Sequence, residues 1–190
     1  GSGVSFGVIE QLRAAYPNLK FLELVHRLDK ETSGLLVLAK KRSALVHLHE
    51  QIRNGRMDKR YYAILQGQLS DKVTHIKAPL HKYVAANGER RVVVAHEGEG
   101  QSAHTQFNID QQAAGFTAVR VKIFTGRTHQ IRVHSASIGH PIVGDDKYGD
   151  FELNKRIAKN TGARMFLHAH SLKFTHPQTG DILTLTAPIP

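Results

Sequence analysis

The sequence predicts a single α+β domain built on one mixed, largely antiparallel β-sheet that is flanked by helices and loops. Residues 72–124 are β-rich throughout, and within them Val119, Val121 and Ile123 alternate with basic residues, as in a half-buried strand. Other segments carry apolar residues at helical spacing. The chain has 190 residues, 41% of them hydrophobic, and no repeat or linker divides it. This suits one domain over residues 1–190.

The first elements are expected to be a helix and two strands. Residues 5–15 have helical spacing, with Ser5 as the cap and Pro17 as the stop. The apolar runs at 21–25 and 35–39 are bounded by turn residues and are predicted to be buried strands. The segment between these two runs is predicted to be a loop.

A helix is expected over residues 43–53, closed by Asn54-Gly55, followed by a strand over 60–66 that ends at Gly67. After the β-rich region, Gly126 breaks the strand 116–124. The remaining elements are a strand at 92–95 after the Asn87-Gly88 turn signal, a helix at 128–138, and strands at 171–175 and 182–186 joined by the turn 177–180.

The excess of positive charge favours nucleic acid as the partner. Lys and Arg number 26 against 16 Asp and Glu, which gives a net charge of +10 at pH 7. Such an excess binds phosphates and releases their counterions. The alternative is a protein that is basic without any such partner.

The chain has no Cys, which excludes disulfides and a thiolate nucleophile and fits a reducing cytoplasm. No stretch approaches the ~18 consecutive apolar residues of a membrane span. No basic start leads into an apolar run, as a signal peptide would require. We therefore expect a cytoplasmic protein with no membrane association, and a monomer.

Three segments carry the candidate chemistry: HRLDKETSG (26–34), KRYYAILQG (59–67) and TGRTHQIRVH (125–134). The first places Asp29 among cations, either as a surface ion pair or as a reactive carboxylate. The third places several donors at the start of a helix, where backbone N–H groups and the helix dipole suit an anion. The alternative for this third segment is a solvated helix with a cationic face.

Metal and other catalytic sites have little support. The chain has 13 His, including the pairs His47/His49 and His168/His170, but it has no HExxH and no obvious third ligand. The adjacent Asp145-Asp146 lies in a turn-rich loop, where carboxylates more often cap or turn. No GxSxG elbow and no Walker A loop is present. We expect no metal and no cofactor.

Five stretches, taken together and in order, resemble the pseudouridine synthases that modify large-subunit ribosomal RNA. They are HRLDKETSGLLVLAK (26–40), the Tyr61 segment, GRTHQIRVH (126–134), GHPIVGDDKYG (139–149) and FLHAHSLKFTHP (166–177). The resemblance implies the pseudouridine synthase fold and conversion of specific uridines to pseudouridine in 23S-type ribosomal RNA. Members of this family usually carry an N-terminal S4-like RNA-binding domain and a first strand. Neither is present, so we expect this chain to be the catalytic domain.

The resemblance also implies residue roles. Asp29 is the essential carboxylate, which either attacks C1′ or abstracts a proton. Arg132 pairs with it. Tyr61 stacks on the target base, with its hydroxyl as a possible proton acceptor at C5, and Ile131 packs on the other side. Core packing is the alternative for both, and Tyr62, on the opposite strand face, would replace Tyr61 if the alignment were off by one residue.

The remaining expected site residues contact RNA. Arg27 is expected to assist the flipping of the target uridine out of its stack. Arg127, His129 and Gln130 are expected to bind RNA rather than to do chemistry. Two other function classes stay open on the sequence alone, a catalytically inactive RNA-binding or ribosome-assembly module and a metal-dependent hydrolase.

Overall fold

A computed structural model describes residues 7–73, 75–96, 98–162 and 164–190. Within these ranges the helices are α1 (Val8–Ala15), α2 (Arg42–Arg53), α3 (Gln130–Ser137) and α4 (Phe151–Thr161). The strands are β1 (Glu23–Leu24), β2 (Ser33–Gly34), β3 (Leu38–Ala39), β4 (Asp58–Gln66), β5 (His75–Lys77), β6 (Leu80–Val84), β7 (Arg90–Val94), β8 (His104–Ala113), β9 (Phe116–Ile123), β10 (Leu167–Thr175) and β11 (Ile182–Thr186). The predicted α+β class is confirmed. The expected cap, Ser5, lies outside the described residues.

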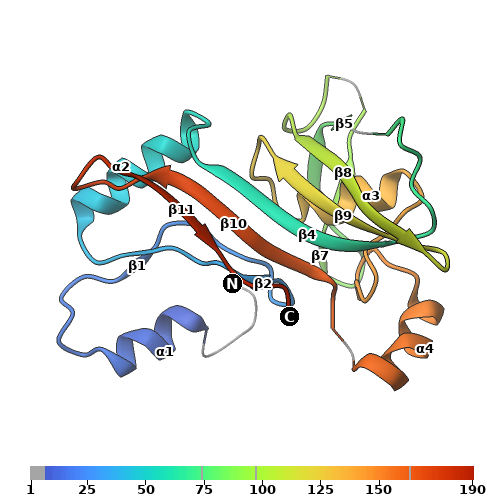
Figure 1. Cartoon of the computed structure of the whole chain (residues 1–190), viewed down its shortest axis with the longest axis horizontal. Coiled ribbons are helices and arrows are strands. Elements are labelled where there is room, and N and C mark those ends of the chain that lie inside the picture. Colours follow the sequence, from blue (N-terminus) through green and yellow to red (C-terminus); the bar gives the residue numbers. More distant parts are fainter. Residues whose placement is uncertain (1–6, 74, 97, 163) are drawn as a thin grey trace.

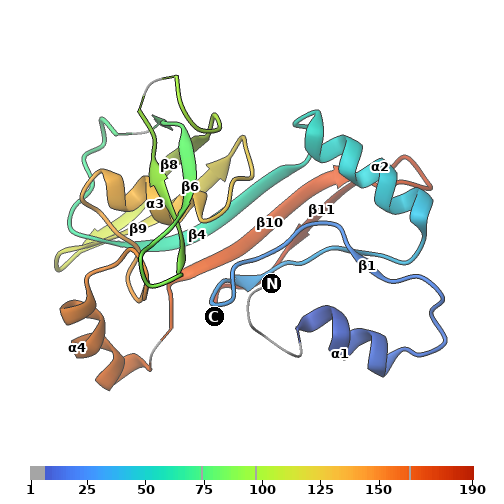
Figure 2. The ribbon, with the colours of Figure 1, turned by 180° about the vertical axis from the view of Figure 1, so that it is seen from behind.

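One long sheet runs through the molecule in the order β11-β10-β4-β9-β8-β5, and neighbouring strands are antiparallel. The short β2 adds a parallel pairing to β10. Two smaller antiparallel pairs, β1–β3 and β6–β7, stand apart from this sheet. Figures 1 and 2 show α1 and α2 toward one end of the long sheet and α4 toward the other. No described helix is both long enough and apolar enough to cross a membrane.

Some elements differ from the sequence prediction. The runs at 21–25 and 35–39 form strands of only two residues each, β1 and β3, which pair with each other. The helix α4 was not predicted: its sequence FELNKRIAKNT has few apolar residues, Phe151, Leu153, Ile157 and Ala158. Its signals are at the ends: the Asp150 side chain accepts a hydrogen bond from the Leu153 N–H, and Gly162 follows at φ 77°.

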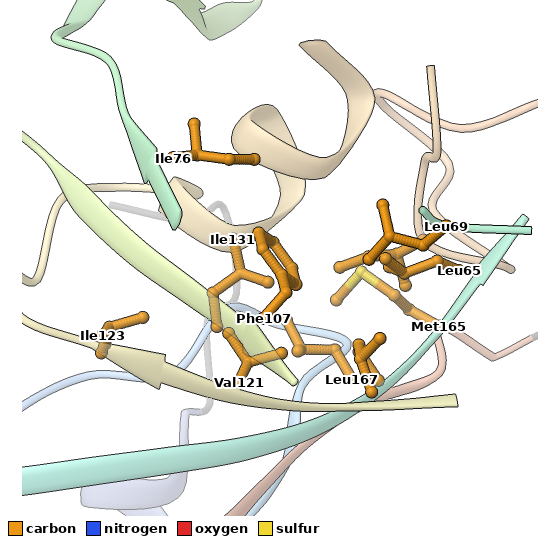
Figure 3. Packing of buried hydrophobic residues seen from close by; sticks show 12 residues of the cluster. Leu65, Leu69, Ile76, Phe107, Val121, Ile123, Ile131, Met165 and Leu167 are labelled. Carbon is orange, nitrogen blue, oxygen red and sulfur yellow. The ribbon is translucent and has the colours of Figure 1, made fainter. Parts of the chain in front are cut away.

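The helix α3 is buried, so the alternative of a solvated helix with a cationic face is wrong. Every residue from Gln130 to Ser135 is buried. Ile131 belongs to the main hydrophobic cluster with Phe107 and Ile76, as Figure 3 shows. Even His134 is enclosed, with its ring bonded to the Thr105 hydroxyl and the Ala78 carbonyl. Packing around residues 130–135 therefore fixes the position of the side chains that α3 carries.

The loop that carries Asp29 is fastened to the long sheet through Gly34. Gly34 has φ 108°, and a Cβ at this position would overlap the backbone of Ala169 in β10. We expect Gly34→Ala to lower the free energy of unfolding by at least ~2 kcal/mol, because backbone strain and overlap act together. Urea denaturation measures this loss. Gly88→Ala is the control, since Gly88 also has a positive φ but has open space around it. Equal losses in both variants would contradict the close approach.

Candidate active site

A cavity of about 690 Å³ brings the three motif segments together. Its lining includes Asp29 from the first segment, Tyr61 from β4 in the second, and Arg127, Ile131 and Arg132 from the third. Asp29 and Arg132 are 103 positions apart in the chain, yet their side chains are in contact. The cavity is therefore the candidate active site.

Asp29 lies in the loop between β1 and β2, and its side chain is 18% exposed. The Arg132 Nη1 atom donates to Asp29 Oδ2 at 3.3 Å. The loop folds back on itself where the Thr32 N–H donates to the Asp29 carbonyl at 3.0 Å. Farther along, the Ser33 hydroxyl contacts His168 Nδ1 at 2.9 Å and accepts from Arg164. These contacts hold the carboxylate at the cavity with one oxygen directed at a cation.

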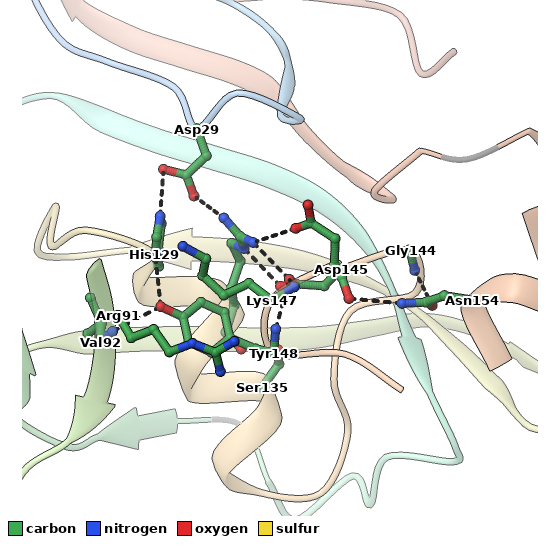
Figure 4. Close-up of polar contacts among 12 residues, drawn as sticks. Asp29, Arg91, Val92, His129, Ser135, Gly144, Asp145, Lys147, Tyr148 and Asn154 are labelled. Carbon is green, nitrogen blue, oxygen red and sulfur yellow. Dashed lines mark hydrogen bonds and ion pairs between the residues drawn. The ribbon is translucent and has the colours of Figure 1, made fainter. Parts of the chain in front are cut away.

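Arg132 is itself anchored by a second carboxylate, Asp145. The Nε and Nη2 atoms of Arg132 each donate to a different oxygen of Asp145, both at 2.8 Å (Figure 4). The guanidinium carbon lies 5.2 Å from the ring centroid of Tyr148. Such a bidentate pair fixes the plane of the guanidinium. The remaining Nη1 is therefore aimed at Asp29.

Asp145 is completely buried, and both of its carboxylate oxygens accept hydrogen bonds. Besides Arg132, its Oδ1 accepts from the backbone N–H groups of Lys147 at 2.9 Å and Tyr148 at 3.0 Å. Burial alone would raise the pKa of Asp145, but the hydrogen bonds and charge of Arg132 lower it below the ordinary value. Burial alone would likewise lower the pKa of Arg132, whereas its pairing with Asp145 and Asp29 raises it. Both groups are thus charged at neutral pH.

Tyr61 faces the cavity and Tyr62 does not. Burial, together with the nearby charge of Asp29, raises the pKa of Tyr61 to about 12. The Tyr62 hydroxyl donates to Asp110 on the opposite face of the sheet. Ile131 also lines the cavity while belonging to the hydrophobic core. The structure therefore brings Tyr61 and Ile131 to the carboxylate and leaves Tyr62 outside.

His129 lies next to Asp29 but does not neutralise it. It has φ 54°, and its Nδ1 atom lies 2.7 Å from the Tyr148 hydroxyl. Its Nε2 atom is 3.9 Å from Asp29 Oδ1. Burial lowers the pKa of His129, an effect that the charge of Asp29 opposes and that of Arg132 reinforces, so the ring is neutral at pH 7. Arg132 is therefore the cation that balances Asp29.

The other expected RNA-binding residues differ in exposure. Arg27 is exposed, lines the cavity and borders a second groove beside it. Arg127 lines the cavity, and its Nε donates to the Ser102 carbonyl at 3.0 Å. Gln130 is 3% exposed, and its amide is bonded at both ends within the protein, accepting from the Arg127 N–H and donating to the His104 carbonyl. Gln130 thus holds the loop that carries Arg127.

Each histidine pair contacts protein groups. His47 Nδ1 lies 3.1 Å from the Gln51 amide, and His49 Nε2 lies 3.0 Å from the Val25 carbonyl. His168 and His170 both contact the Ala187 carbonyl. Among the described residues, no three His, Asp or Glu side chains form a group suited to a metal ion.

Sequence reasoning missed Asp145 and Tyr148 as parts of the site. Both lie in GHPIVGDDKYG (139–149), which the sequence predicted to be a turn-rich loop. Asp145 does shape a turn, since it accepts from the backbone N–H groups of Lys147 and Tyr148, but it also holds Arg132. The sequence did offer one indication of their role. This loop is one of the five stretches that resemble the pseudouridine synthases, and it contains an acidic residue to which no partner was assigned.

Comparison with known proteins gives a consistent set of matches. Residues 9–137 match the family described as RNA pseudouridylate synthase. The chain is 52% identical over 191 residues to "Ribosomal large subunit pseudouridine synthase C" of Escherichia coli (strain K12) and 48% identical over 189 residues to the protein of that name from Haemophilus ducreyi. These alignments cover 100% of this chain but 59% and 58% of the two relatives. The chain therefore spans less than two thirds of the length of these relatives.

Two solved structures share the fold. "Human RNA Pseudouridylate Synthase Domain Containing 1" matches with a TM-score of 0.78 at 26% identity, over 94% of this chain and 72% of that chain. "Human RNA Pseudouridylate Synthase Domain Containing 4" matches with a TM-score of 0.73 at 25% identity, over 94% of this chain and 76% of that chain. Both matches cover nearly the whole arrangement of strands and helices described above.

Proposed function

The chain belongs to the RNA pseudouridylate synthase family, as its sequence motifs indicated, and we propose that it converts specific uridines of large-subunit ribosomal RNA to pseudouridine. The observation that carries this proposal is the Asp29 carboxylate, held at the cavity by Arg132 at 3.3 Å. The names of the relatives support the RNA class, and the net charge of +10 suits a polyanion.

The reaction breaks the bond between C1′ and N1 of the uridine and forms a bond between C1′ and C5. C5 loses its proton and N1 gains one, so the product is an isomer of the substrate. Asp29 either attacks C1′ or abstracts a proton to give a glycal-like intermediate. Both routes need an ionised carboxylate that is close and aligned. The Asp145–Arg132–Asp29 chain of contacts supplies this alignment before substrate arrives. We propose that Tyr61 and Ile131 hold the uracil between them.

The state of the Tyr61 hydroxyl constrains its role. A phenol with a pKa of about 12 carries its proton at neutral pH. It can accept a proton from C5 only if it passes its own proton to another group, and Asp29 is the carboxylate whose charge it feels. The same hydroxyl can also hydrogen-bond the uracil.

We expect Tyr61→Phe to lower the single-turnover rate at least about tenfold, because the ring remains but its hydroxyl is lost from the cavity. Tyr62→Phe is the matched control, since it removes a hydroxyl from the adjacent residue on the opposite face. Its rate should stay within about twofold of wild type. A Tyr62 variant that is slower than the Tyr61 variant would reverse the assignment.

RNA contacts are proposed for Arg27, Arg127 and His129. Arg27 is exposed at the cavity and can stack on bases while contacting phosphate. The target uridine must leave its stack, which costs a few kcal/mol, and such contacts offset that cost. Gln130 contributes indirectly, by holding the Arg127 backbone.

We expect the reaction to proceed in EDTA with no added cofactor. The proposed steps need only a carboxylate, its counter-charge and contacts to the base. Pseudouridine formation would be followed in purified protein before and after chelation. Activity that disappeared with EDTA and returned with zinc or magnesium would contradict the proposal and direct attention to the histidine pairs.

Mapping pseudouridines in ribosomal RNA from a deletion strain tests the function in the cell. One or more sites in large-subunit RNA should lose the modification and regain it when the gene is restored. A pattern identical to wild type would count against the proposal and for an inactive RNA-binding or assembly module. The intact set of Asp29, Tyr61 and Arg132 in one cavity favours the enzyme.

We also propose that the protein is cytoplasmic, in keeping with a ribosomal RNA substrate, and that it acts as a monomer.

A further inference from the structure

Lys59 lies in the active-site cavity, but the chemistry described above does not use it. It is on β4 two residues before Tyr61, and alternate residues of a strand face the same side. Its partner across the sheet is Ile123 and that of Tyr61 is Val121, both of which are buried. Lys59 and Tyr61 both line the cavity. The two Cα atoms are separated by ~6.7 Å along the strand, a distance of the order of one nucleotide.

The Lys59 ammonium has no anionic partner among the residues that the structure describes. The cations on the other face of the same sheet differ in this respect, because Arg60 and Lys122 both pair with Asp58, at 3.0 and 3.4 Å. Lys59 is half-buried, and burial lowers its pKa. A cation that is partly removed from water without a counter-charge is unfavourable, and an incoming anion relieves that cost.

The surroundings of Lys59 leave it available to a ligand. His26 lies on the loop that leads to Asp29, and a histidine side chain cannot supply a negative charge to Lys59. Burial together with the charge of Lys59 lowers the pKa of His26 to about 4, so its ring is neutral at pH 7. Gly126, in the loop before α3, approaches so closely that a Cβ on it would lie 3.0 Å from Lys59 Nζ. The lining of the cavity also carries the cations Arg53 and Arg127, and its carboxylate, Asp29, is held by Arg132. The ammonium thus borders the cavity with no described carboxylate paired to it.

We propose that Lys59 binds a backbone phosphate of the RNA next to the nucleotide whose base lies against Tyr61. The proposal rests on the proposed function for the position of the base, but the phosphate contact itself needs no turnover. A phosphodiester supplies the single negative charge that the cavity lacks at Lys59, and it does so about one nucleotide from the base. Lys59 is then a substrate-binding residue, distinct from the Arg132–Asp29 pair.

The contact can be measured without catalysis by following the titration of the Lys59 side chain in lysine-labelled protein by NMR. The Lys59 signal is assigned by its absence in Lys59→Met. The two probes are a five-nucleotide oligouridylate and the same oligomer with an uncharged methylphosphonate backbone. The phosphodiester oligomer should raise the titration midpoint of Lys59 and the uncharged oligomer should not, because only the former places a charge beside the ammonium.

Kinetics supply the second arm. Lys59→Met should raise KM about tenfold, the scale of one charge-assisted contact, and Lys59→Arg should recover much of the loss because it restores the charge. Arg60→Met is the matched control: it removes one positive charge from the neighbouring position on the opposite face, and its KM should be close to wild type. A purely structural role for Lys59 would lower thermal stability without this rescue.

The outcomes separate the contact from the function. If the phosphodiester oligomer leaves the Lys59 midpoint unchanged, or acts no differently from the uncharged oligomer, the phosphate contact is overturned. If the midpoint rises but ribosomal RNA gains no pseudouridine, the contact stands and the proposed function fails. If the midpoint stays fixed while pseudouridine forms normally in Lys59→Met, the function stands and the contact fails.

Discussion

Asp29→Asn is expected to reduce pseudouridine formation at least about 10³-fold, because the amide keeps the shape of the side chain but cannot act as nucleophile or base. The fold should survive this change. Arg132 keeps Asp145 as its charge partner, through two hydrogen bonds of 2.8 Å each, so no buried cation is left uncompensated. RNA binding should therefore remain near wild type while turnover is lost.

Purified wild type and variant would be compared in a single-turnover assay, with RNA affinity and thermal unfolding measured on the same samples. Asp146→Asn is a matched control, since Asp146 also approaches Arg132, at 3.5 Å, but its side chain is 79% exposed. It should react nearly as fast as wild type, because an exposed ion pair contributes little. Appreciable turnover by purified Asp29→Asn would remove Asp29 from the mechanism.

Arg132→Met is expected to damage turnover far more than Arg127→Met. Arg132 contacts Asp29 and is fixed by Asp145, whereas the guanidinium of Arg127 donates to the backbone carbonyl of the exposed Ser102. Losing Arg132 leaves Asp29 without a counter-charge and without a group that orients it. Losing Arg127 should weaken RNA binding and reduce the salt dependence by about one phosphate contact.

Single-turnover rates at saturating protein separate these two effects, since saturation hides a binding defect but not a chemical one. Arg132→Met also leaves Asp145 buried and unpaired, and breaking a buried pair costs about 3–5 kcal/mol, so each variant must be shown to be folded at the assay temperature. Arg132→Lys is a second variant that keeps the charge but cannot form the bidentate pair. If Arg132→Met and Arg127→Met both reacted at the wild-type rate, the Asp29–Arg132 pair would have to be abandoned.

The three segments that carry the chemistry were the easiest to predict. Their clusters of charged and polar residues are not needed for packing the core, so they indicate a site. The alternation along β4 also predicted that Tyr61 and Tyr62 face opposite sides, and the structure places Tyr61 in the cavity and Tyr62 beside Asp110. Strand periodicity is local, so a short segment is enough to reveal it.

Long-range partners were not predictable in the same way. Asp145 is 13 positions from Arg132, in a loop whose composition already explains its turns, so nothing local indicates that it anchors a guanidinium. Gln130 was grouped with the RNA-binding residues because it is a donor at the start of a predicted helix, whereas tertiary packing encloses it. The helix α4 has few apolar residues, and the caps at its ends indicate a helix only weakly.

We propose above that this cavity isomerises uridine in large-subunit ribosomal RNA, and one assay tests that proposal directly. Because C5 exchanges its hydrogen for a bond to C1′, ribosomal RNA carrying tritium at C5 of uridine reports the reaction directly. Purified protein should release tritium to water from unmodified large-subunit RNA, in an amount that matches the pseudouridine formed, and Asp29→Asn should release none. Folded wild-type protein that bound this RNA and released no tritium would contradict the proposed function.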